Sequence, residues 1–137
     1  MLVMLGAHWL IQDRSIEEDL TPSREFKAPV AATQPLAGHV QVRIEYWIDP
    51  DRADDFKALM QESRRSRLRQ GALAWELLRD IEAPGRYIEQ IVDESWTEHL
   101  RRFDRVTAGD VVLRERKLAF HIGDAAPVVT RSVIETI

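Results

Sequence analysis

Four short segments after residue 38 alternate apolar and polar residues, and this alternation limits the fold more than any other feature of the chain. A period of two places the apolar side chains on one face of a β-strand. We therefore predict strands over residues 40–48, 72–79, 86–94 and 128–136. The clearest segment is the first, with apolar residues at Val40, Val42, Ile44, Tyr46 and Ile48.

Helix signals occupy the intervals between these strands. Asp49 suits an N-cap, Pro50 the first helical position and Gly71 a helix stop. We predict a helix between them that buries Phe56, Leu59, Met60 and Ser63.

Two more caps follow the third strand. Ser95 and Glu98 form a capping box, and Thr107 resembles a weaker cap for a helix through about Phe120. We expect the first of these helices to turn Trp96, Leu100 and Phe103 inward.

The resulting order is strand, helix, strand, strand, helices, strand. It predicts an α+β, ferredoxin-like β-α-β-β-α-β fold, a four-stranded antiparallel sheet with helices on one face. The bare face carries Arg43, Glu45 and Trp47, a mixture poorly suited to open water. Pairing of two sheets would cover it, so we expect a homodimer, a dimeric α/β barrel with a pocket between its sheets.

Residues 1–38 are of another kind. Residues 1–11 are mostly apolar but too few to cross a bilayer, and they make a poor signal peptide. They could pack on the domain, mediate association, or be the end of a membrane helix. Prolines interrupt residues 12–38, which we interpret as a linker. The predicted division is therefore 1–38 and 39–137.

Composition excludes several functions. The chain has no cysteine, which excludes disulfides, thiolate zinc sites and cysteine nucleophiles. A net charge of −4 gives no reason to expect nucleic acid as a partner. Histidine spacing suggests no metal site, and we expect no cofactor. Arginines at 64–69 and 101–102 indicate a solvated helix face, or alternatively a contact with an anion or lipid headgroup.

Several blocks together resemble one bacterial transporter family, the major-facilitator exporters called transmembrane secretion effectors, which are enterobactin-exporter-like. The resemblance is to their C-terminal soluble domain, and it implies that residues 1–11 end the last membrane helix and that the domain is cytoplasmic. The blocks are residues 19–23, 43–50, 56–60, 67–72, 94–100 and 104–107.

That soluble domain is itself similar to the antibiotic-biosynthesis monooxygenase superfamily of dimeric α/β barrels, through Glu94-x-Trp96 at a strand–helix junction. The resemblance therefore implies two functions, an accessory domain of an efflux transporter or a small oxygenase. The Asn-Trp-His triad of haem-degrading members cannot exist here, because the chain contains no Asn.

The candidate site residues each have a structural explanation as well. Catalytic candidates are Arg43, Trp47 and His99, and ligand-binding candidates are Arg43, Glu45, Trp47, Trp75 and Trp96. We expect Trp75 and Trp96 in the core, an ion pair between Arg43 and Glu45, and His99 at the surface, with proton transfer as its alternative role.

Our leading hypothesis is a non-enzymatic accessory domain of an efflux transporter that dimerises through its sheet. It would bind a small aromatic or hydrophobic ligand or regulate transport. The alternative is a cofactor-independent monooxygenase acting on an aromatic polycyclic or quinone-like substrate. A third possibility is a stand-alone dimeric ligand-binding module.

Overall fold

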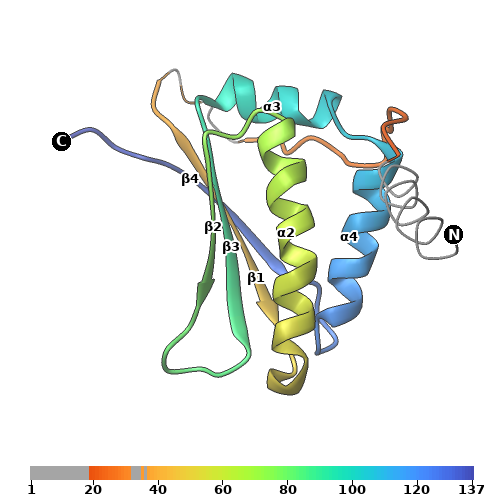
Figure 1. The fold of residues 1–137 in the computed structure, drawn as a ribbon. Helices are drawn as coiled ribbons and strands as arrows, with labels where there is room; N and C mark the ends of the chain where they lie inside the picture. Colours follow the sequence, from red (N-terminus) through yellow and green to blue (C-terminus); the bar gives the residue numbers. More distant parts are fainter. Residues whose placement is uncertain (1–18, 32–34, 36) are drawn as a thin grey trace, which may run out of the picture.

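Figure 1 shows the chain in a computed structural model, which describes residues 19–31, 35 and 37–137. The predictions for residues 1–11 lie outside this part of the chain, and the division at residue 38 stays a prediction. No helix within the described residues is long and apolar enough to span a membrane.

The structure confirms the predicted ferredoxin-like fold. Its antiparallel sheet has the strand order β2-β3-β1-β4, and the helices lie together on one side of it. The last strand is shorter than predicted. In chain order the elements are β1 (Val40–Trp47), the 3-10 helix η1 (Pro50–Arg52), α2 (Ala53–Arg69), β2 (Ala74–Arg79), β3 (Arg86–Asp93), α3 (Trp96–Asp104), α4 (Ala108–Phe120) and β4 (Val128–Val133).

The core lies between the sheet and α2, as the apolar pattern requires. Phe56 of α2 is fully buried, and its ring lies 5.4 Å from that of Tyr46 and 5.5 Å from that of Tyr87. Burial of one such aromatic side chain contributes on the order of 2 kcal/mol. The predicted stripe of α2 is confirmed, since Phe56, Leu59, Met60 and Ser63 are its buried residues.

The buried face of α3 differs from the prediction. Trp96 is buried as expected, but the other buried residues are His99 and Arg102, while Leu100 and Phe103 are half-buried. The reason lies in β3, whose last residue, Asp93, is a fully buried carboxylate that needs polar partners.

Part of the predicted linker is packed against the domain. Residues 19–31 cross the junction of α3 and α4, where the Ser23 amide donates to the Val106 carbonyl at 2.8 Å. The Gly109 amide donates to the Asp19 carbonyl at 2.8 Å, and a Cβ at Gly109 would crowd that same carbonyl. This segment therefore brings Phe26 beside α4, where Arg114 lies over its ring.

Candidate functional site

A cavity of about 250 Å³ lies between the sheet and the helices, on the side where α4 faces β1 and β4. Its apolar wall consists of Phe26, Ile44, Tyr46, Leu113, Leu118, Ala126, Pro127 and Val129. Its polar wall consists of Ser66, Arg67, Gln70, Asp110, Arg114 and Lys117. The pocket predicted between two sheets would lie on the opposite face of the sheet, and that prediction stays untested.

Positive charge dominates the polar wall. Arg67, Arg114 and Lys117 line the cavity, and among the described residues Asp110 is the only carboxylate that lines it. That carboxylate accepts hydrogen bonds from Ser66 at 2.6 Å, Arg69 at 2.6 Å and Gln70 at 3.0 Å. Asp110 is thus already neutralised by its own neighbours, and the cavity is left with an excess of cations.

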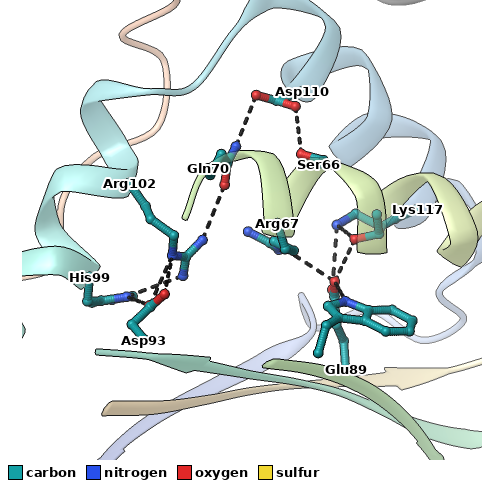
Figure 2. A network of polar contacts seen from close by, with 11 residues as sticks. Ser66, Arg67, Gln70, Glu89, Asp93, His99, Arg102, Asp110 and Lys117 are labelled. Carbon is teal, nitrogen blue, oxygen red and sulfur yellow. Dashed lines mark hydrogen bonds and ion pairs between the residues drawn. The ribbon is translucent and has the colours of Figure 1, made fainter. Parts of the chain in front are cut away.

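Behind this wall, the carboxylate of Glu89 is completely buried at the centre of β3 (Figure 2). Its Oε2 accepts hydrogen bonds from the Ser63 hydroxyl at 2.5 Å and the Trp75 indole at 2.8 Å. Arg67 Nε lies 3.4 Å from the same oxygen, and Lys117 Nζ lies 3.5 Å from Oε1. One carboxylate therefore joins β3 to β2, α2 and α4.

The neighbouring charges set the protonation of this cluster. Burial alone would raise the pKa of Glu89, but Lys117, Arg67 and the two hydrogen bonds outweigh it and hold that pKa far below its usual value. Burial lowers the pKa of Lys117 to about 8, a shift that Glu89 opposes and Arg67 increases. Near neutral pH the pair is therefore ionised, with Lys117 much closer to losing its proton than an exposed lysine.

A second buried carboxylate, Asp93, organises the other end of the core (Figure 2). His99 Nδ1 donates to its Oδ2 at 2.8 Å, and Arg102 Nε lies 2.8 Å from its Oδ1. Arg102 also donates to Gln70, which in turn donates to Asp110. Hydrogen bonds thus run continuously from β3 through α3 and α2 to α4.

The surface position predicted for His99 is wrong. Only 1% of His99 is exposed, and its Nε2 accepts a hydrogen bond from Arg131 Nε at 3.0 Å. With Nδ1 in contact with Asp93 and Nε2 accepting from Arg131, both ring nitrogens are engaged within the described part of the protein. This geometry supports a structural role for His99, and its catalytic role stays a prediction.

Arg43, Glu45 and Trp47 lie on the open face of the sheet, as β1 alternation predicted. The expected pair between Arg43 and Glu45 does not form, because Arg86 of the neighbouring strand reaches Glu45 Oε1 at 3.1 Å. Trp47, 40% exposed, donates its indole N–H to the same carboxylate at 2.9 Å. Among the described residues Arg43 has no hydrogen bond or ion pair.

The two other candidate tryptophans, Trp75 and Trp96, lie on the helix side of the sheet. Trp75 is half-buried and directed to Glu89, and Trp96 is buried in the core with no partner for its indole N–H among the described residues. Both fit the predicted core role. The structure thus separates the candidate residues between two faces of the sheet and does not bring them into one site.

Sequence reasoning missed the two central residues of this region, Glu89 and Lys117. A signal for Glu89 was present, because the period of two in β3 places it on the same face as the buried Tyr87 and Ile91. No comparable signal marked Lys117, which lies among exposed polar residues of α4.

A larger hollow of about 650 Å³ lies between the outer sides of α2 and α4. Its arginines are largely engaged, since Arg116 forms two hydrogen bonds with Glu62 and Arg69 pairs with Asp110. We therefore regard the smaller cavity, with its apolar wall and with Arg114, which forms no ion pair among the described residues, as the candidate site. No group of three or more His, Asp or Glu residues in the described part of the chain could hold a metal ion.

Comparison with known proteins agrees with the sequence resemblance. Residues 1–136 match the family described as transmembrane secretion effector. No curated protein matches the chain.

Among solved structures, a proposed antibiotic biosynthesis monooxygenase from Bordetella bronchiseptica is 25% identical, with a TM-score of 0.60, covering 72% of this chain and 99% of that one. Another from Caulobacter crescentus is 18% identical, with a TM-score of 0.61 and coverages of 73% and 92%. SnoaB, a cofactor-independent oxygenase from Streptomyces nogalater, is 14% identical, with a TM-score of 0.54 and coverages of 73% and 94%. The chain therefore has the fold of antibiotic-biosynthesis-monooxygenase-like domains.

The buried Glu89 cluster predicts a specific pattern of stability. Glu89→Gln should lower the free energy of unfolding by roughly 3–5 kcal/mol, because it leaves Arg67 and Lys117 buried without their counter-ion. Glu89→Gln combined with Lys117→Met should lose less than Glu89→Gln alone. Urea denaturation at pH 7 measures both, with Glu115→Gln at an exposed position of α4 as a control expected to change stability by less than about 0.5 kcal/mol.

The same cluster predicts a pH dependence. The folded-state pKa of Glu89 is lowered, so its contribution is present above the unfolded pKa of about 4.3 and is lost as the pH falls below it. The difference between wild type and Glu89→Gln should therefore shrink below about pH 4. If Glu89→Gln combined with Lys117→Met lowered the free energy of unfolding as much as Glu89→Gln alone, the proposed role of the buried charges would be contradicted.

Proposed function

This chain belongs to the transmembrane secretion effector family, and we propose that it serves there as a non-enzymatic accessory domain that binds a small acidic aromatic molecule. The supporting observation is the cavity beside α4, which combines an apolar wall with an excess of cations. Its volume of about 250 Å³ is slightly below the roughly 300 Å³ at which typical ligand pockets begin. A ligand of one or two rings fits that size.

Two cations are available to such a ligand. Arg114 of α4 lies over the Phe26 ring, with 4.9 Å from its guanidinium carbon to the ring centroid, and it forms no ion pair with the described residues. Lys117 lies one helical turn further along the same helix and faces the same cavity. A carboxylate or phenolate could accept hydrogen bonds from both while its ring packs against Tyr46 and Leu113.

Phe26 gives this site a connection to the preceding part of the chain. It forms part of the cavity wall, and it belongs to residues 19–31, which are hydrogen-bonded across the start of α4. A ligand in the cavity would therefore contact Phe26 and could shift residues 19–31, the segment that leads to the preceding part of the chain. In the proposed function, the domain lies on the cytoplasmic side of a transporter and passes ligand occupancy to it through this segment.

We also propose that the domain forms a homodimer through the open face of its sheet. That face carries half-buried Leu78 and Val92 and exposed Trp47 and Val128 among polar side chains. A face of this composition is suited to sheet-on-sheet packing and is the face that helices leave uncovered.

The second candidate function is a cofactor-independent monooxygenase. Its specific support is the 25% identity to the Bordetella protein, of which the match covers 99%. Against it, the structure gives no residue among Arg43, Trp47 and His99 that faces the cavity beside α4. Fold similarity alone is a weak argument for activity.

Ligand binding can be tested with 1-hydroxy-2-naphthoate, an acidic two-ring probe, by calorimetric titration of the full chain. Arg114→Met should weaken binding about 10- to 100-fold, the effect of losing a charged hydrogen bond of about 1.5–3 kcal/mol. Arg116→Met is the matched control, because Arg116 lies on the same helix but pairs with Glu62. Absence of binding by wild type, or equal weakening in both variants, would overturn the proposal.

Oxygen consumption distinguishes the second candidate. Under our proposal, the protein should oxidise a model anthrone no faster than heat-denatured protein in the same buffer. Turnover by wild type that disappears in Arg43→Ala or Trp47→Phe would instead establish an oxygenase that uses the open face of the sheet.

The dimer is tested by sedimentation equilibrium. Wild type should have the mass of a dimer, twice the chain mass of 15.8 kDa. The variant that combines Leu78→Asp with Val92→Asp should have the mass of a single chain. Val112→Asp is the control, because Val112 is exposed on α4, away from the open face. A monomeric wild type would refute sheet pairing.

A further inference from the structure

Lys117 differs from the other two lysines of the chain in its surroundings. Lys27 is exposed and Lys57 pairs with Asp54 on the surface, whereas Lys117 is 4% exposed and lines the cavity. An amine at the wall of a largely apolar cavity is positioned to meet any molecule that enters it.

The contacts of Lys117 leave its amine weakly held. Nζ donates to the Ser63 hydroxyl at 2.9 Å, and Ser63 donates onward to Glu89 Oε2 at 2.5 Å. The direct contact to Glu89 Oε1 is long, at 3.5 Å, and that oxygen accepts no hydrogen bond from the described residues. An ammonium group can donate three hydrogen bonds, so this one is far from saturated by the described part of the chain.

Charged and titratable groups face this amine from each element packed around it. They are Arg67 from α2, Glu89 from β3, Tyr46 from β1, and Asp110 and Arg114 from α4 itself. Burial lowers the pKa of Lys117 to about 8, Glu89 opposes this and Arg67 adds to it. At pH 8 the neutral amine is therefore on the order of 100 times more abundant than for an ordinary lysine.

We propose that Lys117 captures aromatic aldehydes or ketones that carry an acidic hydroxyl group, by condensing with the carbonyl to form an imine in the cavity. The inference rests on the proposed function, since it needs the cavity to admit a small acidic aromatic molecule. Desolvated lysines beside other cations are suited to this chemistry.

The step balances without an oxidant or reductant. The neutral Nζ attacks the carbonyl carbon, a C–N bond forms as the C=O π bond breaks, and one of the two N–H protons is transferred to the carbonyl oxygen to give a carbinolamine. Loss of the hydroxyl as water, with the remaining N–H proton leaving, gives the C=N bond, so one water is released per imine. The Ser63 hydroxyl touches both Nζ and Glu89, where it can receive and return the proton. Arg114 lies one turn away, where it can bind the acidic group of the ligand.

The test uses salicylaldehyde with cyanoborohydride, which reduces the imine to a stable amine, followed by peptide mapping by mass spectrometry. Wild type at pH 8 should carry the adduct on Lys117 at a yield at least tenfold above that on Lys57. The yield should rise with pH with a midpoint near 8. A salicylaldimine absorption band should appear before reduction.

Variants and a matched ligand separate the possible failures. Lys117→Arg and Lys117→Met should abolish the band, Ser63→Ala should slow its appearance, and Lys57→Arg should leave it unchanged. Salicylate, which has a carboxylate in place of the aldehyde, is titrated in parallel. Salicylate binding without an adduct on Lys117 would overturn this inference and leave the proposed function standing, whereas absence of both would overturn both. Labelling that follows exposure, with Lys57 or Lys27 above Lys117, would also overturn it.

Discussion

One buried carboxylate connects four elements of the domain, β3, β2, α2 and α4. Glu89 lies at the centre of the sheet, and donors from α2, β2 and α4 converge on it. Such a cluster contributes little net stability over an apolar core, because removing two or three charges from water is unfavourable. Its effect is instead geometric, since each donor satisfies the carboxylate only if its helix or strand has the correct position. We regard this requirement as what fixes α4 over β1 and β4, and therefore what shapes the cavity.

The second network performs a related task at the other end of the core. Asp93 orients His99 and Arg102, and Arg102 reaches through Gln70 to Asp110 at the capped start of α4. The two networks thus hold the two ends of the same helix. With α4 fixed at both ends, the backbone that carries Arg114 and Lys117 has a defined position beside the cavity.

A family of secretion effectors and a fold shared with monooxygenase-like domains are compatible with one another. A pocket that can admit an aromatic substrate in one protein can admit a transported or regulatory molecule in another, because the fold supplies the space and side chains decide the chemistry. In this chain the open face has a partly charged surface and the cavity has a cationic wall. The cavity, and not the candidate residues of the open face, therefore carries the functional proposal.

The sequence by itself determined the order of helices and strands, the apolar face of β1 and the caps of α3 and α4. These features depend on residue period and on neighbours a few positions away, so they can be predicted locally. The sequence did not reveal that His99 is buried or that Glu45 pairs with Arg86 and not with Arg43. It did contain enough information to place Glu89 on the buried face of β3. Only the tertiary structure decided which groups meet Glu89, and that Lys117, 28 positions further along the chain, is one of them. The physical reason is that a buried charge is satisfied by whatever packing brings within a few ångströms, and helix packing is not encoded in the spacing of residues along the chain.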